Sequence, residues 1–168
     1  DVNLIIIDNG SPIGGGLLRE KADIYIRNKN NLGYAIAVNE GLKLSRGKLK
    51  AISNNDVRVS PGWQEVAREV LKAPKTYSCH FRMTDYEVPF EYGSKVVYSG
   101  MERWCTGSFY VIGWKRPFFY DEGFLNSYDD WDLFHRVRTW GLKTAYTDKA
   151  VYQHHHSFTQ KQLPEHTN

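Results

Sequence analysis

A short apolar run that ends in three polar residues, Leu49-Lys50-Ala51-Ile52-Ser53-Asn54-Asn55-Asp56, sets the architecture expected of this chain. Its length and composition are typical of a buried strand followed by a turn. Ligands of open α/β sheets bind in the crevice beyond the carboxyl ends of the strands. Asp56 is therefore a candidate for a metal or phosphate site. The alternative is that the three polar residues only form a turn, which Asn and Asp favour through local hydrogen bonds.

A second apolar run also ends at an aspartate. Residues 2–7 are largely β-branched and lead into Asp8-Asn9-Gly10-Ser11, a turn sequence, which predicts another buried strand. Residues 23–27 alternate and predict a short strand. We interpret Gly14-Gly15-Gly16 as a flexible turn, because the segment lacks the lysine of a P-loop and the spacing of the dinucleotide fingerprint.

Strands and helices alternate along the first half of the chain. Helices are predicted at about 34–45, 60–73 and 128–140, and further strands at 77–83, 95–98, 103–114, 143–147 and 150–153. The order strand, strand, helix, strand, helix indicates an α/β fold whose central sheet is mostly parallel and flanked by helices. We expect one domain over residues 1–157 and a tail over 158–168.

A polar residue interrupts the apolar face of the helix predicted at 34–45. Asn39 shares that face with Ala35, Val38 and Leu42, at positions i, i+3, i+4 and i+7. A buried amide without hydrogen bonds costs about 1–3 kcal/mol. Asn39 is therefore expected either to tie down a neighbouring loop or to touch a ligand.

The helix predicted at 128–140 shows the same spacing at its start. Asp130 falls on one face with Leu133, Phe134 and Val137, whereas Asp129 and Asp132 are expected to point elsewhere. The dipole of the helix stabilises acids near its N-terminus, which is a structural explanation for all three. Only Asp130, on the apolar side, needs a further explanation.

Three histidines, His154 to His156, follow the last predicted strand. Residues at i and i+2 of a strand project the same way, so His154 and His156 could act together. Neutral imidazole is a common metal ligand. We expect at least one of these histidines to bind a metal.

Composition excludes several classes of protein. A formal charge of +3 is too small to indicate nucleic-acid binding. Cys79 and Cys105 lie far apart, which argues against a disulfide scaffold and predicts reduced thiols, as in the cytoplasm. No apolar run reaches the roughly 20 residues of a membrane span.

Taken in order, these motifs resemble glycosyltransferase family 2 across nearly the whole chain, and the rhamnosyltransferase-like members most of all. No single motif is specific, but their order and spacing are. They are Asp8-Asn9-Gly10-Ser11, Asn31-Leu32-Gly33-Tyr34-Ala35 with Asn39 and Gly41, Asn54-Asn55-Asp56, Tyr120-Asp121-Glu122-Gly123-Phe124, Tyr128 to Leu133 with Arg136 and Gly141, and His154 to Ser157.

The resemblance implies a GT-A fold, a nucleotide-sugar donor and a divalent metal, Mn²⁺ or Mg²⁺, that bridges the donor diphosphate. The acceptor would be a hydroxyl of a glycan or of a lipid-linked molecule, with no nucleic acid as partner. Such an enzyme would act in the cytoplasm, with room for peripheral association at the cytoplasmic face of a membrane.

Site residues carried over from the resemblance cover the metal, the base and the donor. Asp56 would be the metal-binding acid, with His154 or His156 as a further ligand, while Asn54 replaces the first acid of the family motif. Asp130 would be the general base of a single-displacement, inverting transfer, with Asp129 in place of the usual glutamate. The expected donor-binding residues are Asp8, Asn9, Asn31, Gly33, Asn39, Asn55 and Gly107.

The chain departs from the family pattern at its start. Members usually place a strand and a helix before the Asp-Asn-Gly-Ser strand, and that first strand lies in the middle of the sheet. We therefore expect the usual first strand and helix to be lacking, and an additional segment or subunit to complete the sheet. The competing hypotheses are an inactive nucleotide-sugar or carbohydrate-binding module and a metal-dependent hydrolase or nucleotidyltransferase that uses the same acids.

Overall fold

The computed structural model describes residues 2–12, 16–85, 88–99, 106–113, 117–124 and 128–155. Its elements, in chain order, are β1 (Ile5–Asp8), α1 (Gly16–Lys21), β2 (Ile24–Arg27), α2 (Tyr34–Leu44), β3 (Lys50–Ser53), β4 (Val57–Val59), α3 (Trp63–Val70), β5 (Thr76–Thr84), β6 (Val96–Ser99), β7 (Phe109–Ile112), α4 (Asp129–Thr139) and β8 (Lys143–His154). None of the described helices is long and apolar enough to span a membrane.

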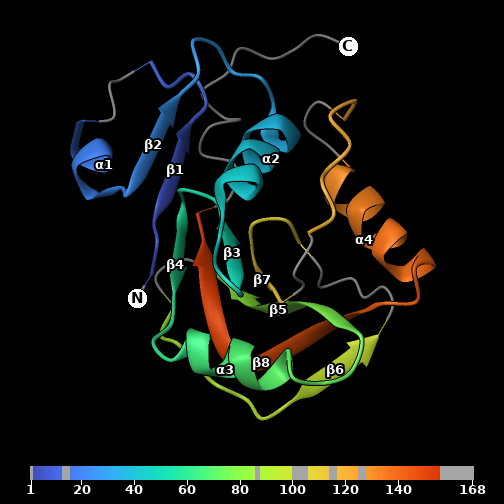
Figure 1. The fold of residues 1–168 in the computed structure, drawn as a ribbon. Helices are drawn as coiled ribbons and strands as arrows, with labels where there is room; N and C mark the ends of the chain where they lie inside the picture. Colours follow the sequence, from blue (N-terminus) through green and yellow to red (C-terminus); the bar gives the residue numbers. More distant parts are fainter. Residues whose placement is uncertain are drawn as a thin grey trace, which may run out of the picture.

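The expected α/β architecture, a central sheet flanked by helices, is confirmed (Figure 1). The larger sheet has the order β3-β7-β5-β8-β4, and β6 also pairs with β8. Its strands are mixed in direction rather than mostly parallel: among the described pairings in this sheet, only β5 with β8 is parallel. The reason is that β7 runs back between β3 and β5, and that β4 and β6 both lie antiparallel to β8.

Strand β8 is continuous where the sequence predicted two strands. Its register against β5 jumps from Phe81 paired with Thr147 to Arg82 paired with Val151. The three intervening residues of β8 are accommodated as a bulge rather than as a turn. One half of β8 therefore pairs with β6 and the other half with β4, which brings His154 beside Val57.

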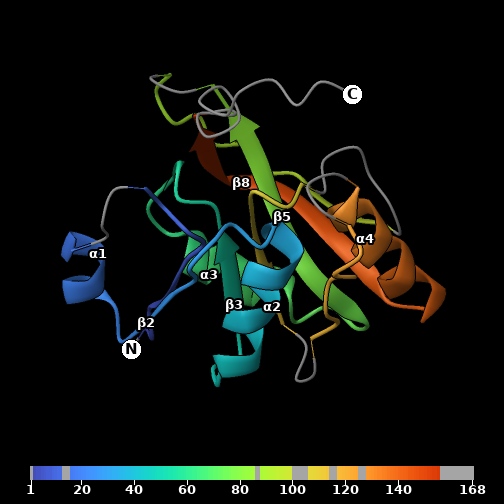
Figure 2. The same cartoon turned by 90° about the horizontal axis from the view of Figure 1, so that it is seen from above.

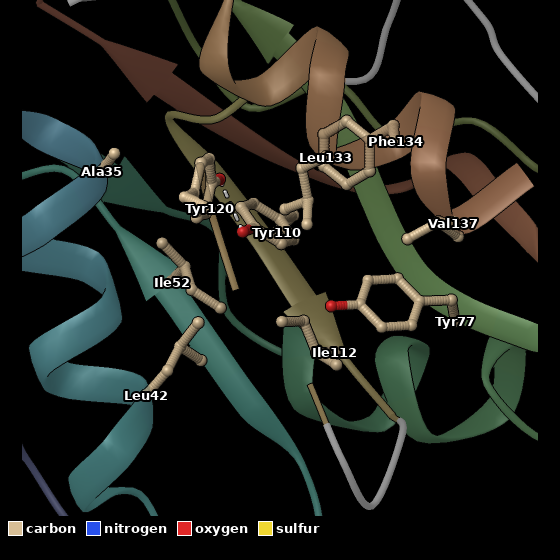
Figure 3. Close-up of a cluster of buried hydrophobic side chains, with 10 residues drawn as sticks. All are labelled: Ala35, Leu42, Ile52, Tyr77, Tyr110, Ile112, Tyr120, Leu133, Phe134 and Val137. Atoms are coloured by element: carbon tan, nitrogen blue, oxygen red, sulfur yellow. Dashed lines mark hydrogen bonds between the residues drawn. The ribbon is translucent and has the colours of Figure 1, made fainter. Parts of the chain in front are cut away.

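Strands β1 and β2 form a separate parallel sheet. Among the described strands β1 pairs with β2 alone, while β3 ends the path of the larger sheet. Helix α2 packs on β1 (Figures 1 and 2). It also contributes Ala35 and Leu42 to the core cluster that includes Ile52 of β3 (Figure 3). The split fits the expected absence of the usual first strand, whose place is in the middle of the sheet.

Strand β7 divides the core in two because successive side chains of a strand point to opposite faces. Tyr110 and Ile112 face the cluster under α2 and α4, in which Leu133 and Phe134 also lie (Figure 3). Phe109 and Val111 face the second cluster, under α3. The helices therefore cover both faces of the larger sheet.

Helix α1 occupies part of a segment that the sequence predicted as a flexible turn. Gly16 begins this helix of six residues, whereas Gly14 and Gly15 lie outside the described residues.

Candidate active site

The turn between β3 and β4 brings Asp56 next to His154. Val57 pairs with His154 across the antiparallel ladder, and the His155 amide donates to the Asp56 carbonyl at 3.0 Å. As a result, Asp56 Oδ1 and His154 Nε2 lie 3.0 Å apart. Both side chains are mostly buried, at 19% and 13% exposure. The three polar residues thus do form a turn, and the turn also aims a carboxylate at an imidazole.

The chemistry of this pair fits a divalent cation. Asp56 Oδ1 is buried and accepts no hydrogen bond in the described part of the chain, although His154 Nε2 lies 3.0 Å from it. Two neighbouring ligands of an octahedral ion, each at about 2.1 Å, lie about 3.0 Å from each other. No group of three or more His, Cys, Asp or Glu side chains gathers among the described residues. Such a cation would thus depend on phosphate oxygens and water for its remaining ligands, as Mg²⁺ commonly does.

Of the other two histidines, only His155 lies within the described residues. His155 is exposed, on the side of the strand away from His154. His156, which we also predicted as a ligand, lies outside the described residues.

Asp130 is held at the first turn of α4 by two backbone amides. Its Oδ2 accepts from the Gly107 N–H at 3.1 Å and its Oδ1 from the Trp131 N–H at 2.8 Å. A Cβ at position 107 would lie 3.4 Å from the Asp130 Cβ and 3.5 Å from the Tyr34 hydroxyl oxygen. A Cβ at this position would make ordinary van der Waals contacts, so the loop before β7 and the start of α4 lie side by side here without requiring glycine.

Tyr34 completes this contact from α2. Its hydroxyl donates to the Gly107 carbonyl at 2.5 Å, and burial raises the pKa of the phenol well above its ordinary value. The backbone of Gly107 thus donates a hydrogen bond to α4 through its N–H and accepts one from α2 through its carbonyl. Tyr34 was not among the predicted site residues, because the sequence shows it only as the first residue of a helix.

Asp129 is more deeply buried than Asp130, and the prediction that it points elsewhere is wrong. It is 7% exposed, because it precedes Leu133 and Val137 by four and eight residues and so shares their inward face. Its Oδ1 accepts from the Asp130 N–H at 3.1 Å, and its Oδ2 has no hydrogen-bond partner among the described residues. Burial raises the pKa of this carboxyl above its ordinary value.

Backbone contacts connect Asp130 with Asp56. Gly107 touches Asp130, and the carbonyl of its neighbour Ser108 accepts from the Asn54 amide at 2.8 Å. Behind this loop the hydroxyls of Thr106, Ser108 and Tyr152 lie 2.7–3.0 Å from one another. None of these three was predicted, since no motif marks them. The base candidate and the metal candidate are therefore fixed to one short piece of backbone, 106–108.

Asp8 lies at the end of β1 with both carboxylate oxygens occupied. Oδ1 accepts from the Ser11 amide at 2.9 Å and Oδ2 from the Tyr25 hydroxyl at 2.7 Å, with Arg27 Nε at 3.6 Å from Oδ2. Burial raises the pKa of Asp8, but these hydrogen bonds and the arginine outweigh it, so the pKa lies below its ordinary value. The carboxylate is charged and holds the turn after β1 in place.

Asn9 and Asn31 shape the loop that precedes α2. The Asn9 amide donates to Asn31 Oδ1 and to the Gly33 carbonyl, both at 2.9 Å, and Asn31 Oδ1 also accepts from the Gly33 N–H at 2.9 Å. Gly33 has a φ of 92°, a left-handed value that favours glycine. This loop sets the start of α2, and so places Tyr34 against Gly107.

The two remaining predicted donor-binding residues differ in their surroundings. Asn39 is buried and donates to the Tyr120 carbonyl and to Glu122 Oε1, both at 2.9 Å, and accepts from the Tyr120 N–H at 2.8 Å. These bonds correspond to the first of the two roles expected for Asn39, in which it holds a neighbouring loop, here the one with Tyr120 and Glu122. Asn55 is exposed in the turn beside Asp56.

Comparison with known proteins agrees with this arrangement. The profile of the family described as Glycosyl transferase family 2 matches residues 1–147. The chain belongs to this family. No curated protein matches this family 2 domain in sequence.

Two solved structures share its fold. One is described as the crystal structure of GalNAc-T7 with UDP, GalNAc and Mn²⁺, with a TM-score of 0.70 and 12% identity over 89% of this chain and 37% of that chain. The other is S. aureus TarS 1-349, with a TM-score of 0.67 and 11% identity over 89% of this chain and 50% of that chain. The family 2 domain thus spans half or less of the length of either structure and has the GT-A fold that the resemblance implied.

Proposed function

We propose that this family 2 domain transfers a sugar from a nucleotide-diphosphate-sugar donor to a hydroxyl of a glycan or lipid-linked acceptor, with inversion at the anomeric carbon. Rhamnose and other hexoses are the proposed sugars, and the cytoplasm, including the surface of a membrane, is the proposed location. The observation that carries the proposal is the fixed path from Asp130 through Gly107 and Ser108 to Asn54 and Asp56. This path connects Asp130, the candidate for proton transfer, with Asp56 and His154, the candidate cation ligands.

Asp130 is the proposed general base. Its oxygens accept two backbone N–H bonds, which fix the orientation of the carboxyl group, and its side chain is only partly buried at the start of α4. An acceptor hydroxyl placed against it can lose its proton as the oxygen attacks the anomeric carbon. One base on the acceptor side matches a single displacement, in which the nucleoside diphosphate leaves from the opposite face.

Asp56 and His154 are the proposed ligands of Mn²⁺ or Mg²⁺. When bound there, the cation would offset the charge that builds up on the departing diphosphate. The exposed Asn55 side chain lies in the same turn, next to Asp56. The GalNAc-T7 structure, whose description names UDP and Mn²⁺, supports this assignment by its fold alone.

Calorimetric titration and product analysis test the proposal. The wild-type protein is titrated with UDP, GDP and dTDP, with and without Mn²⁺, and transfer is then assayed with the matching sugar donors. Asp130→Asn should lower transfer by at least about 100-fold and leave the Kd of the donor within about twofold, because general-base contributions are of that size. Asp56→Ala should remove the Mn²⁺-dependent part of nucleotide affinity.

Asp132→Asn is the matched control. Asp132 lies in the same helix, but its carboxylate accepts from Arg136 at 2.8 Å, so its loss should leave transfer unchanged. Full turnover by Asp130→Asn would refute the base assignment, and retained Mn²⁺-dependent affinity in Asp56→Ala would refute the metal assignment. Nucleotide binding without transfer or donor cleavage would instead favour an inactive binding module.

A further inference from the structure

Two aromatic side chains beside Asp130 are exposed. Tyr128 is 73% and Trp131 is 52% accessible, although large aromatic rings are usually mostly buried. Within the described residues, neither ring stacks on another aromatic ring or lies under a cation. Both rings are therefore available to a ligand.

The positions of these residues place the two rings at the acceptor side of the proposed base. Tyr128 immediately precedes α4 as its N-cap, and Trp131 lies in the first turn of the helix, so the two residues flank Asp130 in the chain. Side chains of a helix lean toward its N-terminus, which carries the Trp131 ring over the turn that holds Asp130. The Trp131 amide also donates to Asp130 Oδ1 at 2.8 Å, which couples the residue to the carboxylate.

Tyr128 has a backbone conformation that a tyrosine rarely adopts. Its φ of 64° and ψ of 2° lie in the left-handed region, which costs a bulky residue free energy that glycine avoids. The side chain is exposed, so burial within this chain does little to offset that cost. The benefit of tyrosine at this position is thus expected in contact with a bound molecule.

The surrounding charge selects the kind of molecule. Of the three acids in the first turn of α4, Asp129 is buried and Asp132 pairs with Arg136 at 2.7 Å, which leaves the Asp130 carboxyl group to face a ligand there. A carboxylate at this place disfavours a phosphate-bearing ligand. A neutral sugar suits the place, because its apolar ring face stacks on an aromatic ring while its hydroxyls donate to carboxylates.

We propose that Tyr128 and Trp131 form a stacking platform for the acceptor sugar, whose reactive hydroxyl then faces Asp130. The platform rests on the proposed transferase function and assigns its acceptor to carbohydrate rings. It also separates the two substrates: the phosphate-bearing donor belongs to the side of Asp56, and the neutral acceptor to the side of the aromatic pair.

Saturation-transfer NMR tests the platform without turnover. The probes are methyl β-D-glucopyranoside, methyl N-acetyl-β-D-glucosaminide and methyl α-L-rhamnopyranoside. At least one should receive saturation on its ring C–H protons from the wild-type protein, and Trp131→Ala should abolish that signal. Trp140→Ala is the matched control, because Trp140 is 75% exposed at the other end of α4 and should be dispensable. An unchanged signal in Trp131→Ala, or no signal for any probe with the wild-type protein, would overturn the platform.

Steady-state transfer supplies the second measurement. Trp131→Ala and Tyr128→Gly should each raise the KM for the acceptor about 5- to 10-fold, the range of typical aromatic contacts, and leave the donor Kd unchanged. Tyr128→Gly should also raise the melting temperature, since glycine removes the backbone strain, so a lost acceptor affinity would not reflect misfolding. An unchanged acceptor KM in both variants would refute the platform, whereas an absence of nucleotide binding by the wild-type protein would refute the proposed transferase function instead.

Discussion

His80 is a single residue whose protonation the fold opposes. The ring is 1% exposed, stacks on Tyr110 at 5.1 Å between centroids and meets the edge of Phe134 at 4.7 Å. Burial lowers its pKa from 6.5 to about 3, although the nearby Thr106 backbone acts in the opposite direction. Because the folded protein binds this proton less readily than the unfolded chain, the stability linked to His80 is complete above pH 6.5. It is lost as the pH falls toward 3.

The free energy of unfolding should therefore decrease between pH 6.5 and 4, with a slope on the order of 1 kcal/mol per pH unit from this group. Urea denaturation of His80→Gln across the same range should give a flatter dependence, since glutamine does not titrate. His135→Gln, at an exposed histidine of α4, should keep the slope of the wild-type protein. Equal slopes for the wild-type protein and His80→Gln would contradict the prediction.

Single residues were predictable where the pattern of their own helix or strand marked them. Asp56 was marked by its place at a strand end, and Asn39 by its place on an apolar helix face. The burial of Asp129 was not predictable in this way, because the width of the inward face of α4 depends on which elements pack against it. The local sequence pattern does not specify that packing.

At the scale of elements, α2 is fastened to the loop before α4. Asn39 makes this connection through three hydrogen bonds, two with the Tyr120 backbone and one with the Glu122 side chain. Asn39→Ala would leave the buried N–H of Tyr120 without its acceptor, so the free energy of unfolding should fall by about 1–3 kcal/mol. Chemical denaturation measures this loss, and Glu122→Gln, which keeps a hydrogen-bonding group at a half-exposed position, should cost far less. Equal losses in the two variants would show that the Tyr120 contacts carry little of the effect.

Helices α2, α3 and α4 were predicted because each carries an apolar stripe several turns long. Strand β4 and helix α1 were not predicted, since three and six residues, respectively, hold too little periodicity to be recognised. The continuity of β8 was missed for a related reason: a bulge and a turn have the same polar signature, and only pairing with β5 distinguishes them.

At the scale of the whole molecule, the described strands form two sheets that differ in how deeply their side chains are buried. The larger one buries side chains on both faces, whereas the β1–β2 pair has two short strands with mostly half-exposed residues. Amides of β1 and β2 should therefore exchange with deuterium at least about 100-fold faster than those of β5 and β7, because local opening there costs less than global unfolding. Exchange measured by NMR or mass spectrometry tests this, with amides of β8 as a slow reference. Uniform protection across both sheets would contradict it.

The order of strands could not be foreseen from alternation alone. A strand-helix-strand pattern predicts parallel neighbours, but the return of β7 between β3 and β5 depends on pairing between segments about 30 to 60 residues apart, for which local pattern provides no signal. The separation of β1 and β2 from the larger sheet was not predicted, because local sequence pattern does not specify which strands pair.

Helix α2 connects the β1–β2 sheet with the loop that carries the proposed site. Helix α2 packs on β1, and its first residue, Tyr34, donates to the Gly107 carbonyl, while the Gly107 N–H donates to Asp130. Tyr34 therefore joins the β1–β2 sheet, where the nucleotide is expected to bind, to the loop that contacts the proposed base. A displacement of β1 relative to β3 is therefore expected to alter the alignment of the proposed base, without any direct contact between β1 and Asp130.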